Sequence, residues 1–230
     1  MTAAAPSPPA PPAAPPPAAP LLVATFNPGK AREIVRLLEA AGFSVVSLAD
    51  PAVRGARGIR DPFEETGATY EENAAGKARH YARLSGLIAI ADDSGIEVEA
   101  LGGGPGPLSA RYGGPALDDA ARNRLLLEAL RSVPEERRGA RYVAVAAVAR
   151  PDGAVRAVEG TCAGRIAAAP RGAAGFGYDP LFFSPDLGAT FAEVPEKRKN
   201  RVSHRGRAFA RLAAFLRSED GRRFLAGAGR

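Results

Sequence analysis

The chain has 230 residues, of which 46% are hydrophobic and 24% are charged, and its formal net charge is +6. This length is enough to bury a core as one large domain or two small lobes. The single cysteine, Cys162, excludes an internal disulfide and a cysteine-rich zinc site, so we expect a reducing, cytoplasmic location. The apolar runs are shorter than the roughly 18 residues of a membrane helix, so we expect no membrane partner.

The charge is unevenly distributed along the chain. Residues 61–99 carry nine Asp or Glu against three Lys or Arg, whereas residues 195–230 carry 11 Lys or Arg against three Asp or Glu. This separation favours a site that holds both a metal ion and an anion over a surface that binds nucleic acid. A nucleic-acid-binding module in the basic segment is the alternative, because a Lys/Arg patch alone is compatible with both.

The first 20 residues consist of Ala and Pro apart from Met1, Thr2 and Ser7. Such a tract lacks the basic start and the uninterrupted apolar stretch of a signal peptide. It cannot bury a core, and it favours extended, solvated backbone. We therefore expect residues 1–20 to form a disordered tail, with a docking role as the alternative, and residues 21–230 to form the folded unit.

Strands and helices alternate through the first half of this unit. The predicted strands are Leu21–Thr25, Phe43–Leu48, Leu87–Ala91 and Ile96–Ala100, and the predicted helices are Lys30–Ala41 and Thr69–Ser85, with a loop over residues 49–68. Gly42 and Gly86 are expected to end the two helices, because glycine tolerates a positive φ. Thr69 and Glu72 have the spacing of a capping box.

The second half contains a long predicted β-hairpin. Ala140–Arg150 and Ala154–Ile166 flank a Pro-Asp-Gly turn. The other predicted elements are a helix over Asp118–Arg131, a Gly-rich loop over residues 170–178, a strand over Leu181–Phe183, and helices over Ser203–Arg217 and Arg222–Leu225. Because a hairpin is antiparallel, we expect an α/β fold with a mixed sheet.

Three motifs in the first half can carry chemistry. Residues 25–30 join a predicted strand to a helix that starts with a lysine. This junction is either a phosphate-binding turn or an ordinary strand–turn–helix connection. Asp92 and Asp93 directly follow a predicted strand, which suits Mg²⁺ binding, with a solvated loop as the alternative. Asn73 and Lys77 lie four residues apart on a predicted helix and can face a phosphate together, or Lys77 is a surface charge.

Two motifs in the second half complete the set. Residues 175–180 interleave glycines with aromatic residues, so they either stack on a planar base or form a turn with core aromatics. Residues 197–207 are strongly basic, with Ser203 placed to cap a helix. The alternatives there are a solvated helix start and nucleic-acid binding.

In their order and spacing, five segments resemble the Ham1/inosine triphosphate pyrophosphatase family over about residues 21–216. The segments are ATFNPGK, EETGATYEENAAGKAR, IADDSGIEVEALGGGPGPLSARYGG, GFGYDPLFF and SHRGRA. The resemblance implies an elongated mixed sheet with flanking helices in two lobes and a central active-site cleft. It also implies a homodimer, and Mg²⁺-dependent hydrolysis of dITP, ITP, XTP or dXTP to the monophosphate and pyrophosphate, with water attacking the α-phosphorus.

The resemblance also implies roles for individual residues. Asp93 matches the general base or metal-bound carboxylate, and Glu64 matches a second Mg²⁺ ligand, although the choice between Glu64 and Glu65 is open. The residues matching substrate contacts are Thr25, Asn27, Lys30 and Lys77 near the phosphates, Ser94, and Phe176, Gly177, Tyr178, Asp179, Lys199, His204 and Arg205 near the base. We expect Arg205 and a His204 or backbone donor to bind the 6-carbonyl that adenine lacks.

This interpretation leaves two points open. Guanine also carries a 6-carbonyl, and the sequence does not identify what rejects its 2-amino group. A pyrophosphatase for modified pyrimidine or methylated nucleotides is the second enzymatic alternative. Phe26 departs from the small residue that the family often has in the phosphate-binding turn.

Overall fold

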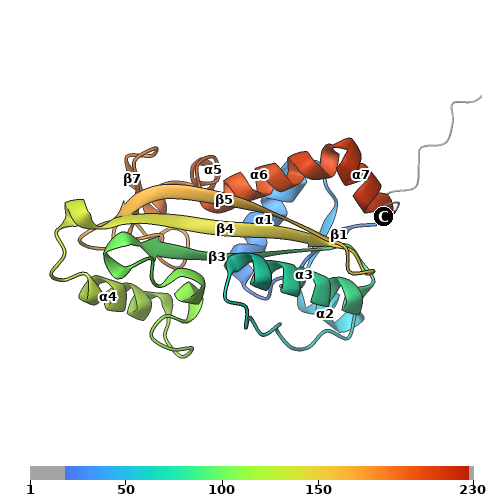
Figure 1. The fold of residues 1–230 in the computed structure, drawn as a ribbon, viewed down its shortest axis with the longest axis horizontal. Coiled ribbons are helices and arrows are strands. Elements are labelled where there is room, and N and C mark those ends of the chain that lie inside the picture. Colours follow the sequence, from blue (N-terminus) through green and yellow to red (C-terminus); the bar gives the residue numbers. More distant parts are fainter. Residues whose placement is uncertain (1–18, 228–230) are drawn as a thin grey trace, which may run out of the picture.

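The structure is a computed structural model that describes residues 19–227, so the predicted tail lies outside the described residues up to Ala18. Its centre is a seven-stranded sheet in the order β2-β1-β3-β4-β5-β6-β7 (Figure 1). The strands are β1 (Leu21–Val23), β2 (Val45–Ser47), β3 (Ala89–Val98), β4 (Gly139–Ala149), β5 (Val155–Ile166), β6 (Phe182–Ser184) and β7 (Ala189–Thr190). The β2-β1-β3 pairs are parallel and the others antiparallel, which confirms the mixed α/β sheet.

Helices flank this sheet on both faces. They are α1 (Pro28–Ala40), α2 (Pro51–Ala56), α3 (Tyr70–Ser85), α4 (Asp119–Ala129), α5 (Glu196–Lys199), α6 (His204–Arg217) and α7 (Glu219–Ala226). Short 3₁₀ segments lie at Glu99–Leu101, Gly106–Arg111, Glu135–Arg137 and Phe191–Glu193. The capping box of α3 is present as predicted, since Glu72 N donates to Thr69 Oγ1 and Thr69 N donates to Glu72 Oε2.

Two predictions about the first half of the fold are wrong. The segments Leu87–Ala91 and Ile96–Ala100 are parts of one continuous strand, β3, because β4 pairs with it at every residue from Ala89 to Val98. Asp92 and Asp93 therefore lie inside a strand rather than after one. The predicted loop over residues 49–68 contains helix α2, which Asp50 caps by accepting a hydrogen bond from Ala52 N at 2.8 Å.

The two faces of the sheet pack against different helices. Ala91, Val143 and Val145 face α3, whereas Ile90, Ala144 and Ala146 face α1 and α6. Because side chains alternate along a strand, Asp92 falls on the α1–α6 face and Asp93 on the α3 face. The close approach of α6 requires glycine at position 160 of β5, where a Cβ would lie 2.4 Å from the carbonyl oxygen of His204.

Strands β3, β4 and β5 run the length of an elongated molecule (Figure 1). Helices α1, α2, α3, α6 and α7 gather toward one end, and α4 and β7 lie at the other end, below and above the long strands in this view. A separate apolar cluster fills this second end, with Leu126 of α4 packed among Tyr142, Phe182 and Phe191. Within residues 19–227, no helix combines the length and the apolar character needed to cross a membrane.

Candidate active site

The phosphate-binding turn predicted at residues 25–30 lies where β1 ends. Asn27 caps α1, with Oδ1 accepting a hydrogen bond from Lys30 N at 3.0 Å, and Thr25 Oγ1 accepts from Asn27 N at 3.2 Å. Strand β1 pairs with β3 only as far as Ile90, so the edge of β3 beyond that residue faces the turn. This arrangement brings the Lys30 ammonium to 3.7 Å from Asp92 Oδ2.

A cavity of about 190 Å³ opens beside this turn. Its lining joins residues of α1, β3, α4, α6 and the Gly-rich loop, which are far apart in sequence. Ten of the predicted substrate contacts line it: Asn27, Lys30, Ser94, Phe176, Gly177, Tyr178, Asp179, Lys199, His204 and Arg205. Thr25 shapes the turn without lining the cavity, and Lys77, Asp93 and Glu64 are not part of the lining.

The buried Arg205 connects three elements on the α1–α6 face. Its Nη1 donates to Glu33 Oε2 at 2.7 Å, its Nε and Nη2 donate to Asp92 Oδ2 at 3.2 and 3.1 Å, and Nη2 also donates to Ser94 Oγ at 3.0 Å. These four hydrogen bonds occupy four of the five N–H groups of the guanidinium. Arg205 therefore joins α1, β3 and α6 at the site, in addition to its predicted role as a base contact.

The charges of this network fix the ionisation of its carboxylates. Burial favours the protonated form of Asp92, but Lys30 and Arg205 outweigh it and lower its pKa to about 2. The same competition between burial and the charges of Arg205 and Lys199 lowers the pKa of Glu33. Both carboxylates are therefore anionic at neutral pH, although each is less than 5% exposed.

Lys199 links this network to the Gly-rich loop. Its ammonium donates to Glu33 Oε1 at 2.8 Å and to Asp179 Oδ2 at 2.6 Å. Asp179 Oδ2 also accepts from Phe176 N at 3.1 Å. Asp179 Oδ2 therefore stabilises the loop that carries this residue and joins it to Lys199. Lys199 and the Arg205 guanidinium lie 5.1 and 5.5 Å from the centre of the Phe176 ring.

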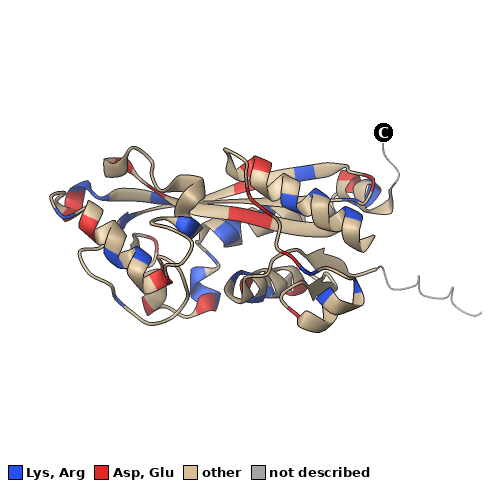
Figure 2. Ribbon diagram, turned by 90° about the horizontal axis from the view of Figure 1, so that it is seen from below, with Lys and Arg blue, Asp and Glu red and all other residues tan. Residues whose placement is uncertain are grey.

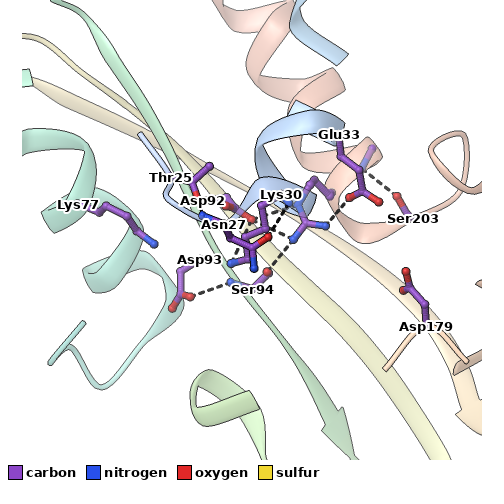
Figure 3. A network of polar contacts seen from close by, with 12 residues as sticks. Thr25, Asn27, Lys30, Glu33, Lys77, Asp92, Asp93, Ser94, Asp179 and Ser203 are labelled. Atoms are coloured by element: carbon purple, nitrogen blue, oxygen red, sulfur yellow. Dashed lines mark hydrogen bonds and ion pairs between the residues drawn. The ribbon is translucent and has the colours of Figure 1, made fainter. Parts of the chain in front are cut away.

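Asp93 occupies a different environment on the α3 face (Figure 3). Its Oδ2 accepts a hydrogen bond from Asn73 Nδ2 at 3.0 Å, and its Oδ1 accepts from Ser94 N at 2.9 Å. Burial and the nearby charge of Glu65 raise the pKa of Asp93 against the opposing influence of Lys30 and Lys77. Asp93 is thus a carboxylate whose charge is only partly compensated by the protein.

Glu64 and Glu65 differ in their orientation. Glu65 is partly buried and forms an ion pair with Lys77, whereas Glu64 is exposed. Burial favours the neutral amine of Lys77, but Glu65 and Asp92 raise its pKa, so it stays charged. Glu65 is therefore the acidic residue of this pair that acts on Asp93, and Lys77 is buried and paired rather than a surface charge.

His204 lies at the start of α6, where its ring packs against other aromatic rings. Its ring is stacked on that of Tyr142, with centroids 4.3 Å apart and planes 6° apart. Burial, together with the charges of Arg205 and Lys199, holds the pKa of His204 well below its usual value. The imidazole is therefore neutral, and its Nδ1 has no hydrogen-bond partner within residues 19–227.

Several residues of the site were missed from the sequence. Glu33 and Tyr142 fall in this group, as do Ser109, Asp119 and Arg122, and all of these except Glu33 line the cavity. Glu33 lies three residues after Lys30 on α1, a spacing that places both on one side of a helix and was an available signal. The α4 residues gave no such signal, because only the tertiary fold brings α4 to the Gly-rich loop.

The basic C-terminal segment is not a separate charged module. Lys199 and Arg205, its most buried cations, pair with acids from α1, β3 and the Gly-rich loop. Figure 2 shows Lys and Arg on elements along the whole length of the molecule. The net positive charge of residues 195–230 is thus partly neutralised within the site.

Comparisons with known proteins agree with this geometry. The sequence model of the Ham1 family matches residues 21–215. The chain is 52% identical to a dITP/XTP pyrophosphatase of Thermus thermophilus over 192 residues, 84% of this chain and 89% of the relative. It is 43% identical to a dITP/XTP pyrophosphatase of Desulforamulus reducens over 85% of this chain and 94% of the relative.

Solved structures give the same result. A HAM1 protein from Coxiella burnetii superposes with a TM-score of 0.74 at 38% identity, over 85% of this chain and 97% of that one. The Ham1 protein of Staphylococcus aureus gives a TM-score of 0.73 at 36% identity, over 86% and 98%. Sequence and fold both point to one family: this chain is a member of the Ham1 family.

Proposed function

We propose that this protein hydrolyses deaminated purine nucleoside triphosphates, dITP or ITP and XTP or dXTP, to the monophosphate and pyrophosphate. One observation carries the proposal: a single cavity joins the Lys30 ammonium to the Phe176 loop and the His204–Arg205 pair, and Asp93 directly precedes Ser94 of its lining on β3. A nucleotide requires a cationic group for its phosphates, and an aromatic ring with fixed hydrogen-bond donors for its base. The dITP/XTP pyrophosphatase activity of the relatives supports the same substrate class.

The reaction requires a base and stabilisation of negative charge. Water attacks the α-phosphorus, the bond to the bridging oxygen of the β-phosphate breaks, and pyrophosphate leaves with that oxygen. Asp93 accepts the proton of the attacking water, because its raised pKa makes it a better base than an ordinary aspartate. Lys30 and Lys77 stabilise the charge that develops on the phosphate oxygens.

The residues present fit a magnesium ion. Asp93 and Glu65 offer carboxylate oxygens, the donors that Mg²⁺ prefers, and the raised pKa of Asp93 reflects charge that a cation would compensate. Within the described residues no group of three acidic, His or Cys side chains gathers, which suits an ion that takes its other ligands from water and phosphates. When bound, Mg²⁺ would neutralise the phosphates; Glu65, in place of the predicted Glu64, is the proposed second ligand.

Base recognition depends on the hydrogen-bond donors that Arg205 and His204 retain at the end of the cavity proposed to bind the base. Arg205 retains one N–H beyond its four internal bonds, and the neutral His204 imidazole carries a single N–H. These donors match the 6-carbonyl of hypoxanthine or xanthine, whereas the 6-amino group of adenine would leave them unpaired. A site of this kind discriminates strongly, because unpaired buried donors are costly.

The resemblance carries three further proposals: a homodimer, a cytoplasmic location, and no nucleic-acid partner. Pairing of Lys199 and Arg205 with internal acids supports the last of these. Light scattering of the purified full chain tests the dimer. Titration with duplex DNA at low salt tests the absence of nucleic-acid binding, since a real interface would bind and weaken steeply with added salt.

A substrate panel tests the activity itself. The full chain is incubated with dITP, XTP, dGTP, dATP and modified pyrimidine triphosphates, with Mg²⁺ or with excess EDTA, and the first phosphorus product is identified. We expect pyrophosphate from dITP and XTP, much slower turnover of dATP, and loss of activity in EDTA. Orthophosphate as the first product, or preference for a pyrimidine nucleotide, would refute the proposal.

A further inference from the structure

Two side chains of helix α4 form hydrogen bonds with one residue of the Gly-rich loop, Gly177. Asp119 Oδ2 accepts a hydrogen bond from Gly177 N at 2.7 Å. Asn123 Nδ2 donates to Gly177 O at 3.1 Å. The two α4 residues are four apart and so lie on one side of the helix. Together they bind both the N–H and the C=O of one residue, which forms a two-point clamp on the loop backbone.

The clamped residue has a backbone conformation that needs support. Gly177 has φ +63°, in the left-handed region that favours glycine. Its neighbours are fixed from other directions, with Phe176 N donating to Asp179 and the Tyr178 hydroxyl donating to Ser109 O at 2.9 Å. The α4 clamp therefore restrains the one residue of Phe176–Asp179 whose flexible backbone would otherwise let Phe176 move.

Helix α4 also reaches the cavity. Asp119 and Arg122 both line its wall next to Gly177. Arg122 is 9% exposed, and its Nε has no hydrogen-bond partner within residues 19–227. The side of α4 that carries the clamp is thus the side that faces the substrate space, so the clamp acts at the end of the cavity formed by the Gly-rich loop and away from Asp93.

We propose that Asp119 and Asn123 are positioning residues for base recognition, because they hold the Gly177 peptide and thereby fix the Phe176 ring. This inference rests on the proposed function for its substrate, a deaminated purine nucleotide. Within residues 19–227, neither residue forms a hydrogen bond or ion pair with Lys30, Lys77 or Asp93. Their loss affects binding of the base more than the chemical step, and it leaves binding of the phosphate chain unchanged.

Kinetics of Asp119→Ala and Asn123→Ala in the full chain test this inference. We expect KM for dITP to rise about tenfold, the effect of losing roughly one hydrogen bond, while kcat changes less than about threefold. The inhibition constant of inorganic tripolyphosphate, which has no base, stays the same. Asp119→Asn, which keeps an acceptor oxygen, restores KM to within about twofold of the parent value. Arg124→Ala, an exposed position on α4, is the matched control.

A second readout needs no substrate. Amide hydrogen exchange of the peptide covering residues 175–180 becomes faster in both alanine variants and stays unchanged in Arg124→Ala. If exchange and KM are unaffected in a folded Asn123→Ala protein, the inference is overturned. A parallel rise in KM and in the tripolyphosphate inhibition constant also overturns it, because that indicates general damage. If the parent protein fails to hydrolyse dITP, the proposed function fails, while the exchange result still decides whether the clamp operates.

Discussion

Asp92 and Asp93 are neighbours in β3, yet the regions around them are built in opposite ways. On the α1–α6 face, Asp92 meets Lys30 and Arg205, and its pKa falls to about 2. On the α3 face, Asp93 is also buried but meets the neutral amide of Asn73, and its pKa is raised. Adjacent carboxylates therefore differ because strand geometry directs them into different surroundings.

This difference favours a structural role for Asp92 and a chemical role for Asp93. The Asp92 region is an internally paired set of charges that joins β3, α1 and α6. The Asp93 region leaves negative charge incompletely compensated, which is what a general base or a metal ligand needs. Loss of the carboxylate is therefore expected to have different consequences at the two positions.

The largest effect is expected on turnover when Asp93 is substituted. Asp93→Asn removes the base while keeping an oxygen that accepts from Asn73, so we expect pyrophosphate release from dITP to fall about 10²–10⁴-fold. The free energy of unfolding changes by no more than about 1 kcal/mol, because the lost charge was not well compensated. Turnover is measured by pyrophosphate detection and stability by urea unfolding. Near-normal turnover would remove Asp93 from the mechanism.

For Asp92 we expect the larger effect to be on stability rather than on turnover. Asp92→Ala leaves the buried guanidinium of Arg205 without its main partner on β3, so we expect a loss of about 3–5 kcal/mol in the free energy of unfolding. Urea unfolding of this variant beside Asp93→Asn gives the comparison directly. If both substitutions destabilise the protein equally, the proposed separation between the two regions is wrong.

The smallest effect concerns pH. Because the pKa of Asp92 is lower in the folded state than its ordinary 3.8, the folded protein binds fewer protons and loses stability as the pH falls. Its contribution of about 2 kcal/mol is present above about pH 4 and is lost toward pH 2. The destabilisation caused by Asp92→Asn, measured by urea unfolding at pH 5 and pH 3, is therefore expected to shrink in acid. A constant difference would contradict the assigned ionisation.

The fold was largely predictable because its signals are local. Hydrophobic periodicity placed α1, α3 and α6, and the turn residues after Arg150 placed the β4–β5 hairpin. The break predicted within β3 failed because Asp92 to Gly95 is polar and carries no strand pattern of its own. Pairing with β4 from Ala89 to Val98 supplies the hydrogen bonds that keep this segment extended.

The candidate site was predictable as a set of residues but not as an arrangement. The motifs identified Lys30, Phe176, Lys199, His204 and Arg205, and the fold brings all of them to one cavity. The partners of these residues were not predictable, since Lys199 binds Glu33 over a separation of 166 residues and Asp179 over 20. Such pairs depend on how helices pack on the sheet, which a local pattern does not encode.

The sequence by itself determined the chemical groups available: a lysine after a strand, two adjacent aspartates, an aromatic glycine loop and a basic end. Tertiary structure decided which of them act together. It turned Asp92 and Asp93 to opposite faces, directed Glu65 rather than Glu64 inward, and used Arg205 to join α1, β3 and α6. The reason is physical: residue type sets what a side chain can do, whereas burial and neighbouring charges from distant segments set its ionisation and its partners.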